Sequence, residues 1–215
     1  MINREKSVYF WIIITFEVFI SVILSIKFLD AGLAFRIMII LKSIRPLHSV
    51  TSNIPDILSF LVGGGTILMW IIYFYRAYQQ KIDIKEKFLK LAATTLPVTY
   101  LLKTLLQISF GRTSPRDWLL DHEPLLFKGF NEASGGSFPS GHMAVFTAFG
   151  AAVLLYFPKY RKPLTIILVI LGAALIGTDY HYLSDVIAGA YLGFIISYIF
   201  WYVYERLSAK QQNYL

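Results

Sequence analysis

Cysteine is absent from this chain, and charged residues make up only 15% of its 215 residues. Without cysteine the chain can form neither disulfides nor thiolate-ligated metal sites. Soluble domains average about 25% charged residues, so a soluble domain of ordinary composition is excluded as well. Hydrophobic residues instead reach 56%, with a mean hydropathy of +0.59. The composition therefore predicts a polytopic membrane protein, and the length suits one domain over residues 1–215.

The net charge of +7 fits the same class. In a membrane protein, an excess of lysine and arginine usually lies in the cytoplasmic loops, and it can also attract anionic lipid headgroups. The chain carries no nucleic-acid-binding motif, and its basic residues do not lie on a soluble face. We therefore expect a membrane and a lipid as its partners, no nucleic acid, and no obligate protein partner.

Six apolar stretches are candidates for membrane-spanning helices, which need about 20 mainly apolar residues. They cover residues 8–29, 54–78, 88–109, 142–157, 163–178 and 185–204. The expected fold class is therefore all-α, with six transmembrane helices.

The connections between these stretches differ in charge. Lysine and arginine are concentrated before the first span, in the second and fourth connections, and after the last span. The positive-inside rule places these segments in the cytoplasm. Both termini are then expected inside, and the loops 30–53, 110–141 and 179–184 outside. Residues 31–45 have two interpretations: an amphipathic segment lying flat in the outer interface, or an ordinary tight connection.

Three polar motifs meet at the outer side in this topology. FGRTSPR (110–116) follows the third span, FPSGH (138–142) begins the fourth, and HYLSD (181–185) leads into the sixth. The order of the spans therefore brings Arg112, His142, His181 and Asp185 to one membrane surface.

FPSGH suits the binding of an anion. Ser140 is a good helix N-cap, and Gly141 lets a ligand approach the backbone closely. The first amides of the following helix, with the positive end of its dipole, favour a negative charge. His142 is then placed to donate a proton to a group held there.

HYLSD suits a nucleophile or a base. His181 and Asp185 are four residues apart, so on a helix they share a face and the carboxylate can orient the imidazole. Arg112 can hold phosphate oxygens in a fork. Together these residues favour phosphoryl transfer at the outer membrane surface. The plainer interpretations are a capped loop for FPSGH, and a structural pair or half of a metal site for His181 and Asp185.

KTLLQISFGRTSPR, FPSGH and HYLSD together resemble the type 2 phosphatidic acid phosphatase superfamily, six-helix lipid phosphatases related in fold to vanadium-dependent haloperoxidases. The resemblance covers residues from about 103 to 204. It implies that His181 attacks phosphorus and forms a phosphohistidine, that Asp185 orients it, and that His142 protonates the leaving oxygen. It also implies that no metal or cofactor is needed. The implied phosphate-binding residues are Arg112, Lys103, Ser140 and Gly141.

The chain departs from the family pattern at both cationic motifs. Gln107 and Ser114 stand where the first motif has lysine and arginine. Lys103 lies one helical turn before Gln107, where it can either reach the outer face or serve as an interface anchor. The third motif lacks its arginine, a gap that resembles the sphingolipid-synthase branch, and Arg116 is a candidate replacement.

We therefore expect an integral membrane phosphatase that acts at the outer face of the inner (cytoplasmic) membrane. The candidate substrates are lipid A, undecaprenyl diphosphate, phosphatidylglycerol phosphate and phosphatidate. Two alternatives stay open: a phosphotransferase that moves a lipid headgroup to another lipid, and a non-catalytic relative that kept the fold.

Overall fold

The computed structural model describes residues 4–43, 54–80, 83–131 and 136–212. Throughout these ranges the regular structure is helical, apart from an isolated antiparallel bridge between Arg112 and Phe127. The all-α expectation is therefore confirmed.

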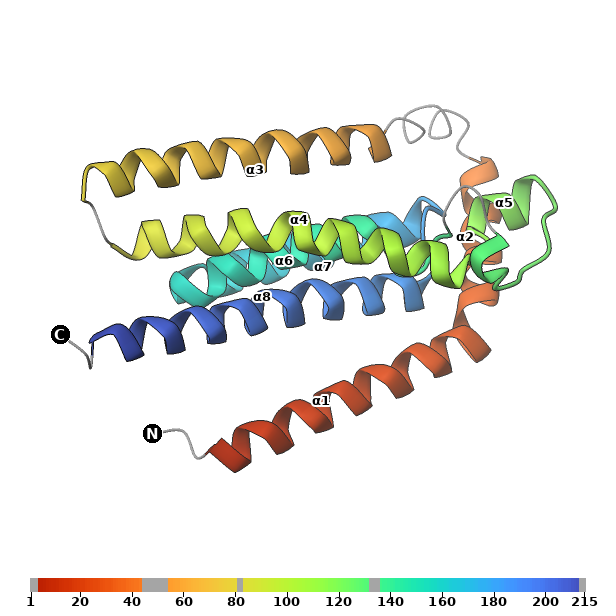
Figure 1. The fold of residues 1–215 in the computed structure, drawn as a ribbon. Helices are drawn as coiled ribbons and strands as arrows, with labels where there is room; N and C mark the ends of the chain where they lie inside the picture. Colours follow the sequence, from red (N-terminus) through yellow and green to blue (C-terminus); the bar gives the residue numbers. More distant parts are fainter. Residues whose placement is uncertain (1–3, 44–53, 81–82, 132–135, 213–215) are drawn as a thin grey trace.

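Six long helices run along one axis (Figure 1). The first, α1 (Arg4–Leu24), continues through a π-helical stretch, η1 (Ser25–Leu29), into the crosswise helix α2 (Asp30–Ser43). The others are α3 (Ile54–Tyr78), α4 (Ile84–Phe110), α6 (Gly141–Tyr156), α7 (Arg161–Gly177) and α8 (Leu183–Gln212). Short helices lie in the connections: α5 (Pro115–Leu120), η2 (Gly129–Asn131) and η3 (Pro158–Tyr160).

Five helical stretches of the described chain are long and apolar enough to cross a membrane. They are Tyr9–Ser43, Ile57–Tyr78, Ile84–Phe110, Pro158–Gly177 and Leu183–Lys210. The fourth predicted span corresponds to α6, which has 16 residues and lies mostly inside the bundle. Because its neighbours cover it, α6 does not need the length of a lipid-facing helix. The polytopic membrane class is confirmed.

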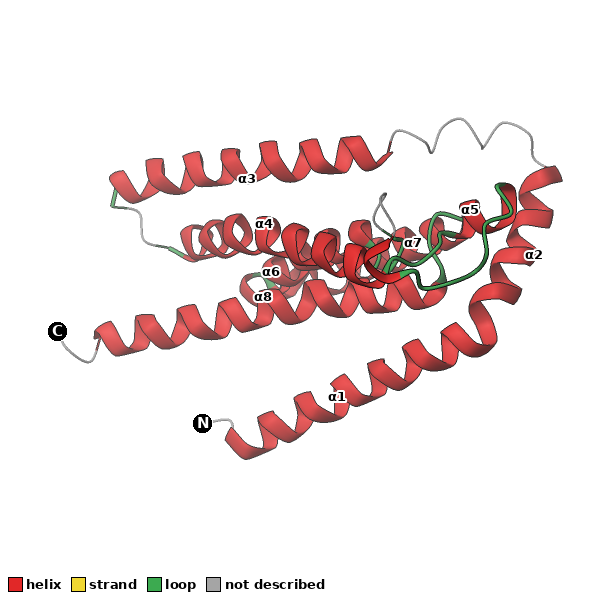
Figure 2. Cartoon of the chain, turned by 45° about the vertical axis from the view of Figure 1, so that its right-hand side comes forward, coloured by secondary structure: helices red, strands yellow, loops and turns green. Residues whose placement is uncertain are grey.

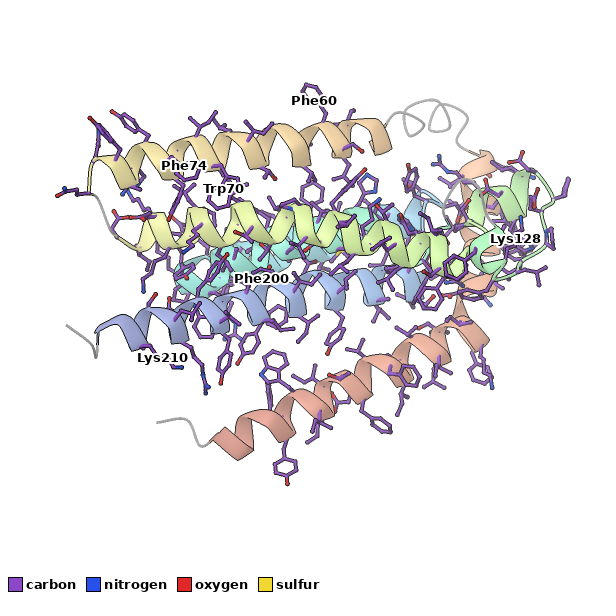
Figure 3. The ribbon with its side chains drawn as sticks, in the orientation of Figure 1. Phe60, Trp70, Phe74, Lys128, Phe200 and Lys210 are labelled. Carbon is purple, nitrogen blue, oxygen red and sulfur yellow. The ribbon has the colours of Figure 1, made fainter. Side chains whose placement is uncertain are left out.

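The outer surface of the bundle is apolar. On α3, the Phe60 ring is 83% exposed and points away from the other helices (Figure 3). Phe74 on the same helix and Phe16 on α1 are also mostly exposed. Contiguous apolar exposure of this extent marks a surface made for lipid or another apolar partner, as the composition predicts.

The centre of the bundle is the packing of α6 against α8 and α4. Ala144 and Ala148 on α6 are fully buried, and Gly193 on α8 lies against the Ala144 carbonyl so closely that a Cβ atom would stand 2.0 Å from it. These small residues let the two helix backbones approach each other, as is common between membrane helices. The start of α6 is thereby fixed against α8.

The two ends of the bundle differ in what they carry. Both chain ends and the turn between α3 and α4 lie at one end, while α2 and α5 lie at the other (Figures 1 and 2). This is the pairing of termini and loops that the charge pattern predicts. Helix α2 runs across its end of the bundle (Figure 2) and covers residues 31–43 of the segment with two interpretations, while residues 44 and 45 lie outside the described residues.

Candidate active site

A polar cavity of about 380 Å³ lies among α3, α4, α5, the start of α6 and the connection before α8. The sequence motifs supply half of its lining residues, among them Lys103, Gln107, Arg116, Gly141, His142 and His181. Segments that are far apart in the sequence therefore meet here, as the topology predicts.

The FPSGH motif forms the turn that opens α6. The Ser140 hydroxyl accepts a hydrogen bond from the Met143 amide at 3.3 Å, so Ser140 is the expected N-cap. The Ser140 amide donates to the Asp185 carbonyl at 3.0 Å, which ties the turn to α8. Gly141 and His142 follow in the first turn of the helix and line the cavity. The helix therefore begins at the cavity, where the positive end of its dipole favours an anion.

His181 lies between the cavity and a fully buried carboxylate. Its Nδ1 atom is 3.6 Å from Asp185 Oδ2, longer than a direct hydrogen bond. The same Oδ2 atom accepts the Tyr182 amide at 3.0 Å, and Oδ1 accepts the Arg112 guanidinium at 2.6 Å. Since Nδ1 faces Asp185, Nε2 is the ring nitrogen available to the cavity. The His142 and His181 ring centroids are 6.3 Å apart, so a small group between them would be within reach of both.

Lys103 reaches the cavity from α4. Its ammonium donates to Gln107 Oε1 at 3.1 Å and lies 4.5 Å from the centroid of the Tyr100 ring. A Cβ atom at Gly141 would be 3.2 Å from the Lys103 Nζ atom, so the ammonium lies directly beside the FPSGH turn. Gln107 Nε2 in turn donates to the Pro139 carbonyl at 3.0 Å. The lysine that is one turn early in the sequence is therefore still at the site.

Arg112 has a different position from the one expected of a phosphate-binding residue. Its guanidinium is 2% exposed and forms ion pairs with Asp185 at 2.6 Å and Asp30 at 2.7 Å. It lies behind Asp185, outside the lining of the cavity. Gly111 ends α4 in a left-handed conformation with φ of 52°. The chain turns at this residue, so the Arg112 side chain enters the protein interior.

Arg116 occupies the cavity instead. It lies in the first turn of α5, and one of its terminal nitrogens donates to the Thr178 carbonyl at 3.0 Å. Its guanidinium carbon is 5.0 Å from the centroid of the Tyr180 ring. Nearby, burial raises the pKa of Asp179 to about 6, while the charge of Arg116 opposes this rise. Arg116, the candidate replacement for the arginine missing from the third motif of this chain, therefore lines the cavity.

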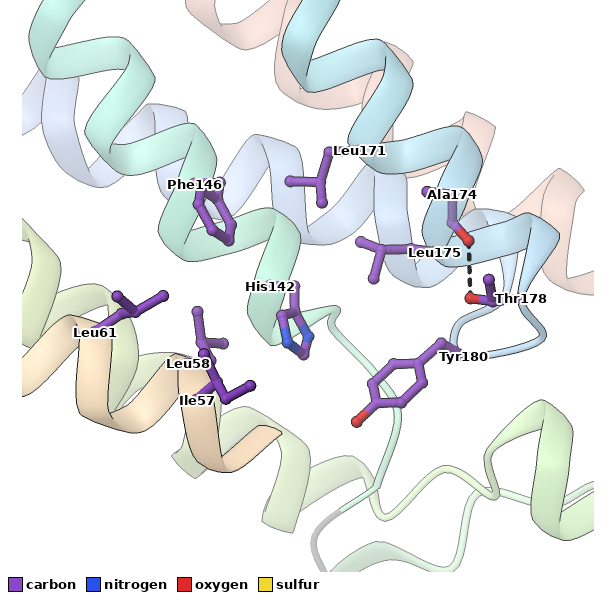
Figure 4. Close-up of a pocket in the computed structure, with 10 residues that line it drawn as sticks. All are labelled: Ile57, Leu58, Leu61, His142, Phe146, Leu171, Ala174, Leu175, Thr178 and Tyr180. Carbon is purple, nitrogen blue, oxygen red and sulfur yellow. Dashed lines mark hydrogen bonds between the residues drawn. The ribbon is translucent and has the colours of Figure 1, made fainter. Parts of the chain in front are cut away.

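A second, apolar cavity of about 300 Å³ adjoins the polar one. Figure 4 shows its lining, with Leu58 from α3, Phe146 from α6 and Leu175 from α7 facing one another. His142 and Tyr180 line both cavities. A ligand with a phosphate and an apolar tail could therefore occupy both at once.

The described residues contain no group of three or more His, Asp or Glu side chains that could hold a metal ion.

Sequence reasoning missed Asp30 and Gly189. Asp30 is a charged residue at the end of an apolar stretch, which is a signal for a buried partner. Gly189 lies where a Cβ atom would be 2.4 Å from the Ser140 carbonyl. The sequence signal for Gly189 was its spacing: it is four residues after Asp185, so on a helix both residues lie on the same face.

Comparison with known proteins agrees with the motifs. The sequence model of the family described as the PAP2 superfamily matches residues 88–209. Two curated proteins named lipid A 1-phosphatase are similar to the chain. That of Rhizobium etli is 39% identical over 53% of this chain and 49% of its own length. That of Rhizobium johnstonii is 37% identical over 52% of this chain and 46% of its own length. The match thus spans about half the length of these relatives, and no solved structure matches the chain significantly.

Proposed function

The chain belongs to the PAP2 superfamily, and from this membership and the geometry of the two cavities we propose that it is a membrane phosphatase that hydrolyses a lipid phosphate. The observation that carries the proposal is the junction of the cavities. The polar one holds two histidines, a lysine and an arginine, and the apolar one continues from it past His142 and Tyr180.

His181 is the nucleophile in the proposed reaction. Its Nε2 atom attacks phosphorus, the N–P bond forms, and the bond from phosphorus to the lipid oxygen breaks. Asp185 holds the Nδ1 side of the ring, 3.6 Å away, and balances the positive charge that develops on the imidazole. His142 gives its proton to the lipid oxygen as this oxygen leaves.

Hydrolysis of the phosphohistidine completes the cycle. His142, now neutral, takes a proton from a water molecule, and the water oxygen attacks phosphorus. The N–P bond breaks and inorganic phosphate leaves. His142 regains the proton that it lost in the first step, so the residues return to their starting state and water is the only reactant consumed.

The charge of the phosphate is balanced from three directions. The Lys103 ammonium lies beside Gly141, and Arg116 lines the same cavity together with His181. The positive end of the dipole of α6, which begins at Gly141, adds to the attraction for the phosphate. Arg112 is assigned to Asp185 and not to the phosphate, because its guanidinium already holds two carboxylates.

Lipid A is the first candidate substrate, because both relatives described above are named lipid A 1-phosphatase. Undecaprenyl diphosphate, phosphatidylglycerol phosphate and phosphatidate carry the same phosphate chemistry on an apolar tail and follow it. The basic connections support a topology with both termini in the cytoplasm and the cavity at the outer face of the inner membrane.

The test is phosphate release from these four lipids by the purified protein in detergent with EDTA. We expect release from at least one lipid, and loss of it in His181→Ala and in His142→Ala. Release that survives His181→Ala would overturn the nucleophile. Transfer of the phosphoryl group to an added second lipid with a free hydroxyl, without release of inorganic phosphate, would identify a phosphotransferase, and no turnover by a folded wild type would identify a non-catalytic relative.

A further inference from the structure

The bend between α1 and α2 places a carboxylate inside the bundle. Asp30 is the first residue of α2, and its side chain is 1% exposed. Its Oδ2 atom accepts hydrogen bonds from Arg112 at 2.7 Å and from the Ser184 hydroxyl, and its Oδ1 atom accepts the Ser184 amide at 3.1 Å. The partners come from residues 82 and 154 positions later in the chain, so a helix outside the family-matched range, 88–209, contacts the segment that carries Asp185.

Arg112 joins this carboxylate to that of the site. One terminal nitrogen of the guanidinium donates to Asp30, and the other donates to Asp185 Oδ1 and to the Ser184 hydroxyl, both at 2.6 Å. The plane of the guanidinium is also held by the Tyr182 ring, whose centroid is 4.1 Å from its central carbon. The cation is therefore fixed between two carboxylates.

We propose that Asp30 is a positioning residue for the phosphoryl transfer described above. It holds Arg112 against Asp185 Oδ1, so that Asp185 Oδ2 stays directed at the Nδ1 atom of His181. This inference depends on the proposed function, because the atom that it positions is the proposed nucleophile.

The charges explain why a carboxylate is needed at this place. A buried ion is unfavourable unless it is paired and hydrogen-bonded. Arg112 with Asp185 alone would form a neutral pair, with the guanidinium free to take both oxygens of Asp185 in a bidentate fork. With Asp30 present, Arg112 is shared, and Oδ2 remains for the Tyr182 amide and His181.

The chain offers a matched control on the same pair of helical segments. The Tyr191 hydroxyl on α8 hydrogen-bonds to the Thr15 hydroxyl on α1 at 2.6 Å, away from the site. Asp30→Asn and Tyr191→Phe each remove hydrogen-bonding capacity between the N-terminal helices and α8. Only Asp30→Asn changes a partner of Arg112. If Asp30 served only to hold the helices together, both variants should therefore have the same effect on kcat.

The experiment measures kcat and KM for phosphate release by the detergent-solubilised full chain, together with its thermal unfolding. Asp30→Asn should lower kcat about 10- to 100-fold with KM within about twofold, while Tyr191→Phe keeps the kcat of the wild type. In an Arg112→Met background, Asp30→Asn should have no further effect on kcat, since its action passes through Arg112. If Asp30→Asn does not fold, Ser184→Ala is the second variant. It removes the hydroxyl that hydrogen-bonds to both Asp30 and Arg112, and it should lower kcat about 10-fold.

The outcomes separate the two proposals. A wild type whose phosphate release is lost in His181→Ala, with Asp30→Asn or Ser184→Ala at the kcat of the wild type, overturns the positioning role alone. So does an effect of Asp30→Asn that is equally large with and without Arg112. A wild type that releases no phosphate overturns the proposed function, and the role of Asp30 with it.

Discussion

Gly189 offers a sharp test of the contact between α8 and the FPSGH turn. A Cβ atom on this residue would be 2.4 Å from the Ser140 carbonyl oxygen, 3.2 Å from the Ser140 Cβ atom and 3.3 Å from the Ala144 amide nitrogen. None of these atoms is the far end of a flexible side chain. In Gly189→Ala, α8 and the start of α6 must therefore move apart.

The size of the movement follows from the contact distance. An ordinary contact begins at 3.4 Å, so the 2.4 Å approach requires a separation of 1.0 Å. The same interface carries the hydrogen bond from the Ser140 amide to the Asp185 carbonyl at 3.0 Å, so the shift also moves Asp185 relative to His142. Overpacking of this kind costs about 1–3 kcal/mol, and misplacing reacting groups by about 1 Å can lower a rate about 100-fold.

The assay is phosphate release together with thermal unfolding in detergent. We expect Gly189→Ala to lower kcat about 100-fold and to lower the unfolding temperature. Gly64→Ala on α3 is the control, because a Cβ atom there would have no atom within 4 Å. Alanine is more favourable than glycine inside a helix by about 0.5–1 kcal/mol, so this variant should not be destabilised. A Gly189→Ala protein with the kcat and unfolding temperature of the wild type would refute the argument from close approach.

Two further predictions concern charges at the cavity. Burial raises the pKa of Asp179 to about 6, so its contribution to stability is full below the unfolded pKa of 3.8 and is lost as the pH rises through about 6. Asp179→Asn should therefore raise the unfolding temperature at about pH 8 and leave it unchanged at about pH 4; asparagine tolerates the positive φ of 51°. Lys103→Gln should lower kcat/KM about 10- to 100-fold, and adding Gln107→Lys should restore most of it, because both side chains reach the cavity. If the single and double variants have equal kcat/KM, an ammonium at position 107 does not replace the one at position 103, and the prediction of a restored rate is wrong.

The helices follow from hydropathy, but their ends depend on contacts that the sequence does not display. The span predicted at 54–78 has the bounds of α3. The first span was predicted to end at residue 29. The structure continues into α2, because Asp30 pairs with Arg112, 82 residues later in the chain. A long-range ion pair of this kind leaves no periodic signal.

The site was predictable where topology alone brings residues together. Alternating spans return His142 and His181 to one end of the bundle, and both line the cavity. The two arginines could not be assigned in the same way, because the direction of a side chain after a helix depends on the turn that follows. Gly111 ends α4 in the left-handed conformation, which turns Arg112 inward, and the Ser114 cap begins α5 with Arg116 in its first turn.

The departures from the family motifs share a physical logic. The cavity needs positive charge near the phosphate, but electrostatic attraction depends on distance and not on the position of a residue in the sequence. Under the proposed function, a lysine one turn early on α4 and an arginine on α5 supply this charge. The third motif of the family has its arginine six residues before the histidine; this chain has Leu175 there, and Leu175 lines the apolar cavity. Because the arginine is on α5 and not on α7, the side of the site formed by α7 is apolar. Under the proposed function, the tail of the lipid therefore extends from the site between α3 and α7.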